Sequence, residues 1–352
     1  MLQLSVPERA LGVCAASAGN HAQGVAFGCK SLRVKGIIFM ADTVPLQKKE
    51  RVEYLGNSWV QTVSFGKNFD EANARAREHA AEHNLIFIPP FDDEYVIAGQ
   101  GILGVELLER CPENVDAVVG PIGGGGLMAG VATAVKAMSP HTRTIGVEAK
   151  GAESMTISRE KGKLTTLDTV DTFVDGAAVR TPGIKTFEIG LEVIDETVVV
   201  EPGKVAEEML NFRNRESVWL EPAGALSIAA LDQLEIKGKT IVCILSGGNH
   251  DSARDEEVRQ RMADYQGLEP HFIVTLPERA GAFLQFASAC IPPDEVINVR
   301  YKKEHSHETG HLFVGMQFKS KKNRAAFLAR LKELDMPCEI IGRDNPLFRY
   351  FA

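Results

Sequence analysis

The sequence predicts an α/β protein built on parallel sheets, followed by a small α+β domain with a ferredoxin-like order of elements. Two observations carry this prediction. Up to about residue 265, short apolar or β-branched runs alternate with longer helical patterns, as in parallel sheets wrapped by helices. After Gly267 the order changes to β-α-β-β-α-β, the pattern of a ferredoxin-like domain. With 352 residues, the chain has room for two or three domains.

The expected elements follow from these patterns. In the first region, strands are expected over residues 11–14, 34–40, 58–64, 85–89, 115–120, 143–147 and 240–245. The helices between them are expected over residues 21–29, 45–55, 69–83, 102–110 and 127–138. A linker is expected over residues 264–270. Beyond it we expect strands over 272–276, 295–303, 312–318 and 338–341, a turn over 305–310, and helices over 280–290 and 323–334.

The composition points away from nucleic acids and membranes. A formal net charge of −8 argues against binding a phosphate backbone or an anionic membrane surface, because both need a basic face. No stretch approaches the roughly 20 apolar residues that span a bilayer, and the N-terminal segment lacks the pattern of a signal peptide. The six scattered cysteines form no C-x-x-C pair and fit reduced thiols better than disulfides or zinc. We therefore expect a cytoplasmic protein with no nucleic-acid or membrane partner.

Three short turns at the ends of predicted strands, here called elbows, carry the chemistry. The first elbow, Ser-Ala-Gly-Asn-His-Ala-Gln-Gly over residues 17–24, opens a helix with free backbone N–H groups that suit a carboxylate. A simple helix cap by Ser17 or Asn20 is the alternative. The third elbow, Ser-Gly-Gly-Asn-His over residues 246–250, places a hydroxyl at the carboxyl end of a strand.

The second elbow consists of four consecutive glycines, residues 123–126, before a predicted helix. So many glycines cost conformational entropy, and a phosphate wrapped by backbone N–H groups explains them. No lysine and hydroxyl residue follow in the P-loop pattern, so a nucleoside triphosphate is not expected. With Ala129 the loop also matches the dinucleotide pattern G-x-G-x-x-A, and Glu148 lies downstream. That fingerprint belongs at the first strand of a domain, however, and here other strands come before it.

Three elbows of different chemistry suit one ligand with a phosphate, a polar ring and a carboxylate. Pyridoxal phosphate bound to an amino acid has these features. On these motifs the chain closely resembles the threonine ammonia-lyases (threonine dehydratases) among the fold-type II, tryptophan synthase β-like, pyridoxal-phosphate enzymes. It is similar to the biosynthetic form with one ACT-like regulatory domain. The resemblance implies two parallel-sheet domains, at about 1–97 and 98–267 within a catalytic region 1–267, and an ACT-like domain at 268–352.

The resemblance also implies roles for the elbow residues. Asn20 hydrogen-bonds the phenolic oxygen of the cofactor, and Ser246 faces its pyridine nitrogen. Glu221, in Glu-Pro-Ala-Gly-Ala, lies near the ring, whereas Asp175 is either near the ring or purely structural. The cofactor phosphate is held by Gly123, Gly124, Gly125, Gly126 and the N–H group of Leu127. The substrate carboxylate is bound, mainly through backbone N–H groups, by Ser17, Ala18, Gly19 and His21.

Three positions bear on the type of reaction and on metals. A neutral hydroxyl at Ser246 cannot keep the pyridine nitrogen protonated, which favours prompt loss of a β-hydroxyl over transamination. Ala18 stands where related serine racemases carry a second serine that acts as a base, so racemisation is not expected. Glu148 falls where those relatives bind a divalent cation, but a serine replaces the expected aspartate nearby. We therefore predict no metal site, with Glu148 as a solvated carboxylate at a strand end.

The family holds its cofactor as a Schiff base on a lysine in a Ser-Phe-Lys-x-Arg-Gly segment, which this sequence does not contain. That lysine is expected upstream of Met1. Lys30, in the helix after the first elbow, lies about 15 Å from Asn20 at ~1.5 Å per residue, which is too far to reach the ring. The implied activity is conversion of L-threonine to 2-oxobutanoate and ammonia, with L-serine as a slower substrate. The alternative is a truncated, inactive subunit that binds amino acids and regulates a mixed oligomer.

Residues 277–282 bridge the first strand and helix of the C-terminal domain. They resemble the loop of ACT-like domains at which a small amino acid docks. Isoleucine as inhibitor, valine as its antagonist and a homotetramer are what the resemblance implies. A helix N-terminus behind a proline turn is the alternative for this loop.

Overall fold

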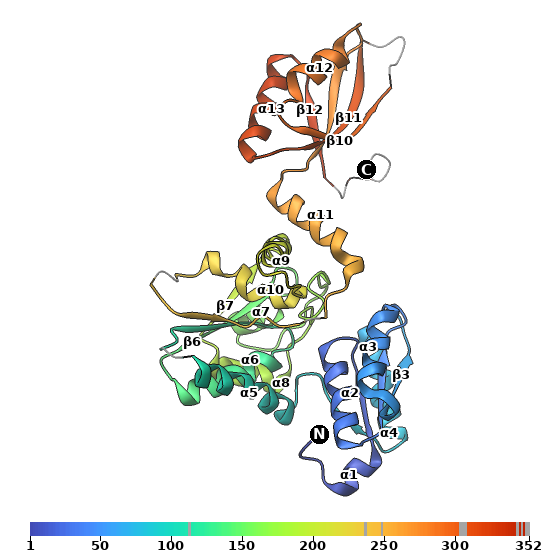
Figure 1. The fold of residues 1–352 in the computed structure, drawn as a ribbon, viewed down its shortest axis with the longest axis vertical. Coiled ribbons are helices and arrows are strands. Elements are labelled where there is room, and N and C mark those ends of the chain that lie inside the picture. Colours follow the sequence, from blue (N-terminus) through green and yellow to red (C-terminus); the bar gives the residue numbers. More distant parts are fainter. Residues whose placement is uncertain are drawn as a thin grey trace. The chain divides into compact units, whose positions relative to one another are not determined.

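The computed structural model describes residues 1–111, 114–235, 238–247, 249–302, 308–342, 345 and 348. It divides into two compact units, Met1–Ala253 and Arg254–Ala352 (Figure 1). The first unit contains two four-stranded sheets, and the second unit contains one. None of the helices in the described part of the chain has the length and apolarity that a membrane crossing needs.

The first sheet has the strand order β3-β2-β1-β4, and all of its pairs are parallel. Strand β1 is fully buried because helices cover both faces: α2 and α3 pack on one face and α4 on the other. The strands are β1 (Val13–Ala16), β2 (Gly36–Met40), β3 (Val60–Ser64) and β4 (Ile86–Phe87). The helices are α1 (Val6–Leu11), α2 (Asn20–Leu32), α3 (Leu46–Gly56), the 3₁₀ turn η1 (Asn57–Trp59) and α4 (Phe69–Glu82).

The second sheet has the order β7-β6-β5-β8, again with parallel pairs. Its central strand β5 is buried along its whole length, between a core contributed by α6 and a face contacted by α10. The strands are β5 (Ala117–Pro121), β6 (Arg143–Ala149), β7 (Glu196–Val200) and β8 (Ile241–Cys243). The helices are α5 (Glu94–Arg110), α6 (Gly126–Met138), α7 (Ser154–Lys161), α8 (Ile184–Val193), α9 (Pro202–Glu216), α10 (Pro222–Ala229), η2 (Leu231–Gln233) and η3 (Ser252–Arg254).

The second unit confirms the predicted ferredoxin-like order. Its antiparallel sheet runs β10-β11-β9-β12, with α12 and α13 packed on one face through a core that includes Phe272, Phe286 and Phe327 (Figure 1). The elements are α11 (Asp255–Gln266), β9 (His271–Pro277), α12 (Ala282–Cys290), β10 (Glu295–Tyr301), β11 (Thr309–Gln317), α13 (Lys321–Glu333) and β12 (Cys338–Ile341). The predicted turn over 305–310 lies partly outside the described residues.

Parallel sheets wrapped by helices are therefore confirmed, with local differences. The strand predicted from residue 11 begins at Val13, because residues 6–11 form helix α1 instead. Ser5 and Glu8 cap that helix reciprocally, and Gly12, at φ 89°, ends it. The segment 264–270, predicted as a linker, begins inside α11, which ends at Gln266.

Candidate active site

All three elbows stand at the carboxyl ends of parallel strands in the first unit. They follow β1, β5 and β8, and they line a single cavity of about 2410 Å³. Ligands of open parallel sheets bind at this edge. The cavity is larger than one cofactor needs, so it has room for a substrate as well. Its lining includes all the predicted site residues: Ser17, Ala18, Gly19, Asn20, His21, Gly123, Gly124, Gly125, Gly126, Leu127, Asp175, Glu221 and Ser246.

The glycine loop brings backbone very close to neighbouring protein atoms. Gly125 has φ 93° at the N-cap of α6, a conformation that side chains rarely adopt. A Cβ on Gly124 would lie 2.3 Å from the ring of Phe91, and one on Gly123 would lie 2.8 Å from Ala177 Cα. Only residues without side chains can follow this path.

The same loop leaves its donors available. Within the described part of the chain, the backbone N–H groups of residues 124–127 donate to no protein acceptor, and no side chain caps α6. Buried N–H groups without a partner are costly, and the start of a helix favours negative charge. A phosphate group would satisfy these donors, so the loop fits the phosphate of pyridoxal phosphate.

The first elbow is not a simple side-chain cap. Gly19 occupies the N-cap of α2, and within the described residues α2 has no side-chain cap hydrogen bond. The Ser17 hydroxyl accepts only from the nearby Gly19 N–H, at 3.1 Å. The Nδ2 group of Asn20 instead donates to Glu221 Oε1, at 2.8 Å. The capping alternative is therefore wrong, and both side chains remain at the cavity.

His21 is held by the segment after β4. Its Nε2 lies 3.0 Å from the backbone oxygen of Ile88, which can only accept, so we assign the proton to Nε2. Burial lowers the pKa of His21, although the Ile88 contact partly opposes this shift. The imidazole is thus neutral near pH 7 and fixed in orientation.

Glu221 links the first and third elbows. It is 6% exposed, accepts from the Asn20 amide, and is also hydrogen-bonded by Ser246. Its backbone N–H donates to the oxygen of Gly247, at 3.1 Å. Burial raises the pKa of Glu221, and the charge of Asp175 adds to this, whereas the hydrogen bonds from Asn20 and Ser246 oppose it. Two of the residues predicted to contact the cofactor are therefore held by one carboxylate.

Asp175 is paired with Lys48, a residue that the sequence motifs do not predict at the site. Lys48 Nζ lies 3.0 Å from Asp175 Oδ2, and its side chain is only 15% exposed. Lys48 also lines the cavity, early in α3, the helix that follows β2. The rule that ligands gather at the carboxyl ends of parallel strands could have indicated it. Gln23, which donates to Asn249 Oδ1 at 2.9 Å, is a second link between the first and third elbows.

Glu148 corrects one prediction. It is fully buried rather than solvated, and it accepts from the N–H groups of Met155 and Thr156 and from the Thr156 hydroxyl. The carboxylate therefore caps the first turn of α7. It serves neither as a dinucleotide ribose contact nor as a ligand in a group of three metal-binding side chains among the described residues.

Burial raises the pKa of Glu148 to about 7 from the ordinary 4.5, despite opposing hydrogen bonds from Thr156 and Met155. Because the folded state binds the proton more tightly than the unfolded state, this group lowers stability as pH rises through that interval. We predict that the unfolding free energy of the wild type falls, relative to Glu148→Gln, between pH 4.5 and about 7. Urea unfolding at a series of pH values measures this difference. A constant difference would show that Glu148 keeps an ordinary pKa.

The site and the sheets define the class of protein, and comparisons with known proteins agree. Residues 1–247 match the family of pyridoxal-phosphate dependent enzymes, and residues 260–351 match the C-terminal regulatory domain of threonine dehydratase. The chain is similar to the biosynthetic L-threonine dehydratase IlvA of Bacillus subtilis strain 168. The two are 41% identical over 351 residues, which cover 99% of this chain and 83% of the relative. IlvA of Halalkalibacterium halodurans is also 41% identical, over 98% of this chain and 84% of its own length.

Solved structures give the same result. The processed form of threonine deaminase isoform 2 from Solanum lycopersicum superposes with a TM-score of 0.71 at 41% identity, covering 74% of this chain and 76% of that one. Maize serine racemase gives a TM-score of 0.67 at 29% identity, covering 75% and 81%. The protein is thus a fold-type II enzyme with pyridoxal phosphate as its cofactor. The chain belongs to the threonine dehydratase family.

Proposed function

We propose that the protein eliminates water from L-threonine to give, after hydrolysis, 2-oxobutanoate and ammonia, the first step of isoleucine biosynthesis. L-Serine is the slower substrate and gives pyruvate. The observation that carries the proposal is the convergence of a cradle of free N–H groups, Asn20 and Ser246 on one cavity. Similarity to dehydratases along nearly the whole chain supports the choice of substrate.

We assign each of these residues a proposed role from its position at the cavity. The N–H groups of residues 124–127 would hold the phosphate of the cofactor, Asn20 its phenolic oxygen and Ser246 its pyridine nitrogen. The first elbow binds the substrate carboxylate, with neutral His21 beside it. When bound, pyridoxal phosphate supplies the electron sink that loosens the Cα proton and the β-hydroxyl. Glu221 acts as a positioning residue, since it restrains the side chains of Asn20 and Ser246 together.

Ser246 and Ala18 direct the chemistry towards elimination. The Ser246 hydroxyl would not keep the pyridine nitrogen of the bound cofactor protonated, which favours prompt loss of a β-hydroxyl over transamination. Ala18 has no group that could deliver a proton to the opposite face of the substrate. The site therefore favours prompt departure of the hydroxyl over racemisation.

Replacing Ala18 with serine tests this assignment. We expect Ala18→Ser to form D-serine from L-serine, because the new hydroxyl supplies a proton donor on the second face. Chiral chromatography of the reaction mixture measures the product. Ala18→Gly is the matched control, since it changes the same position without adding a hydroxyl. D-Serine formed equally by the wild type or by Ala18→Gly would contradict the role given to Ala18.

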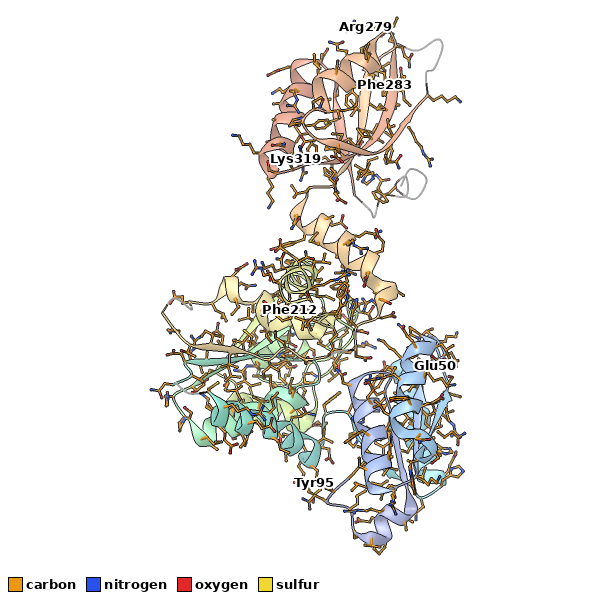
Figure 2. The ribbon with its side chains drawn as sticks, viewed as in Figure 1. Glu50, Tyr95, Phe212, Arg279, Phe283 and Lys319 are labelled. Atoms are coloured by element: carbon orange, nitrogen blue, oxygen red, sulfur yellow. The ribbon has the colours of Figure 1, made fainter. Side chains whose placement is uncertain are left out.

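The second unit is a regulatory domain of the threonine dehydratase type. We propose that isoleucine inhibits the enzyme and that valine opposes this inhibition. Both effectors would bind at the loop 277–282, which joins β9 to α12, and the enzyme would be a homotetramer. Arg279 lies in this loop, and Phe283 follows it in α12 (Figure 2). Arg279 donates to Gln285, and the Phe283 ring stacks on that of Tyr301 with the centroids 5.4 Å apart. Calorimetry with isoleucine tests the effector, and absence of binding would remove this part of the proposal.

The function itself is tested by product analysis. The protein produced with the Schiff-base lysine of its family, and supplied with pyridoxal phosphate, is expected to release equimolar 2-oxobutanoate and ammonia from L-threonine, and pyruvate from L-serine at a lower rate. Turnover of serine without turnover of threonine would overturn the substrate assignment while keeping the reaction type.

The six cysteines, all free, support the further proposal that the enzyme works in the cytoplasm.

A further inference from the structure

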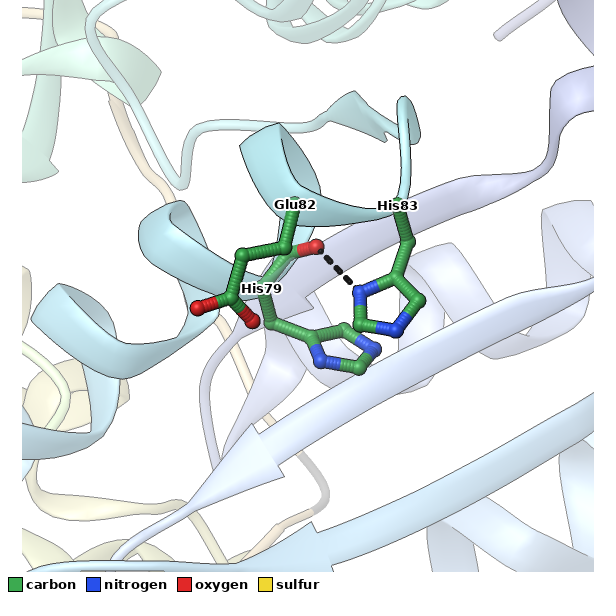
Figure 3. Close-up of side chains that lie close together, drawn as sticks. All are labelled: His79, Glu82 and His83. Carbon is green, nitrogen blue, oxygen red and sulfur yellow. Dashed lines mark hydrogen bonds between the residues drawn. The ribbon is translucent and has the colours of Figure 1, made fainter.

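Three side chains of types that can ligate a metal ion lie close together at the C-terminal end of α4, in addition to the residues that line the cavity. His79, Glu82 and His83 each offer a ligand atom, and these atoms lie within 4.8 Å of one another (Figure 3). The two histidines are four residues apart, which places them on the same side of the last helical turn. In the part of the chain that the structure describes, this is the only group of three such residues found.

The histidine rings are oriented as a pair. Their centroids are 4.0 Å apart, and the His79 ring also lies 5.3 Å from the ring of Phe39. Nδ1 of His83 lies 3.0 Å from the backbone oxygen of His79, so we assign the ring proton to Nδ1 (Figure 3). This leaves Nε2 of His83 as a free electron-pair donor. A backbone carbonyl that fixes the tautomer is the usual outer partner of a metal-binding histidine.

His79 has an unsatisfied nitrogen. Its Nε2 atom is buried and has no hydrogen-bond partner among the described residues. A buried polar atom without a partner destabilises the folded chain, and a metal ion bound to it would relieve this cost.

Glu82 is held in place by Arg75. The two groups form a paired contact, with both nitrogen–oxygen distances at 3.1 Å. Each carboxylate oxygen has a second lone pair, so this contact orients Glu82 without exhausting its capacity. Hydrogen-bonded carboxylates are common among metal ligands. The C-terminal end of a helix also favours positive charge.

We propose that His79, Glu82 and His83 form a binding site for a borderline transition-metal dication, with zinc as the best match. Two imidazoles and one carboxylate are a zinc ligand set that leaves a fourth position for water. Magnesium and calcium prefer sites built from oxygen ligands alone. Neither the cofactor nor the regulatory domain takes part in this site.

Titration of the full chain with zinc chloride tests the proposal, with calorimetry and thermal unfolding as readouts. We expect one zinc ion per chain and a rise in melting temperature. His83→Ala removes an exposed ligand, and His79→Gln removes the second. Since loss of an outer partner costs about 10–100-fold in affinity, loss of either histidine should cost at least about tenfold. Glu82→Gln should weaken binding as well, and excess magnesium should not compete.

His141→Ala is the matched control, because His141 is an exposed histidine on the loop after α6. It should bind zinc as the wild type does. If partly exposed cysteines held the zinc instead, His83→Ala and His79→Gln would bind zinc as tightly as the wild type. That result would overturn the proposal. Absence of stoichiometric zinc binding to the wild type would overturn it too.

Discussion

Replacing Gly125 with alanine is expected to weaken pyridoxal-phosphate binding by on the order of 100-fold. A side chain at φ 93° costs about 1–2 kcal/mol. The added Cβ would also lie 2.8 Å from both Met155 Cε and Thr186 Oγ1. To relieve the backbone strain and these close contacts, the loop must move, which withdraws N–H groups from the phosphate. Each charge-assisted hydrogen bond lost there costs about 1.5–3 kcal/mol of binding free energy. Titration with the cofactor, followed by its absorbance, measures the loss.

Gly162→Ala separates this effect from backbone strain in general. Gly162 also has positive φ, at 64°, but it ends α7 and its Cβ would meet nothing within 4 Å. The substitution should lower stability by a similar strain energy and leave the cofactor affinity unchanged. Equal losses of affinity in the two variants would show that the Gly125 loop is not the phosphate site.

The second large effect is expected at Gly224, inside α10. A Cβ there would lie 1.8 Å from the backbone oxygen of Ser246, so α10 and the third elbow, which follows β8, must separate. Overpacking of this kind costs about 1–3 kcal/mol of stability. Because Ser227 Oγ also donates to the oxygen of Ile244, at 2.8 Å, the helix positions this strand end. Gly224→Ala should therefore lower both the unfolding free energy and the cofactor affinity.

Gly99→Ala is the matched control for the helical environment. Gly99 lies within α5, is exposed, and its Cβ would meet nothing within 4 Å. Alanine should stabilise the protein there by about 0.5–1 kcal/mol, because it restricts the unfolded chain. Denaturant unfolding should thus show a lower unfolding free energy for Gly224→Ala and a higher one for Gly99→Ala. Stabilisation by Gly224→Ala would contradict the close contact with Ser246.

The elbows could be predicted because their signals are local. Each consists of consecutive residues directly after an apolar strand, and the parallel arrangement then requires them to share one edge. Helix α1 is not among the predicted elements, although its signal is also local. Ser5 and Glu8 form a capping box, and Pro7 lies in the first turn. The apolar Leu11 was assigned to the strand instead.

The contacts between elbows could not be predicted in this way. Asn20 and Glu221 are 201 positions apart, and no pattern in either segment predicts that the two side chains meet. Lys48 and Asp175 meet only because separate segments reach the same cavity. The burial of Glu148 depends on how α7 folds back over the end of β6, which the alternation of strands and helices does not specify. Local patterns thus predicted the parts of the site, and tertiary packing determined their partners.

We infer that the three elbows together hold one molecule of pyridoxal phosphate. A crystal structure of the protein grown with the cofactor tests it most directly. We expect the phosphate on the backbone nitrogens of Gly124, Gly125, Gly126 and Leu127, and the ring between Asn20 and Ser246. A phosphate bound elsewhere, with the glycine loop unchanged, would contradict it.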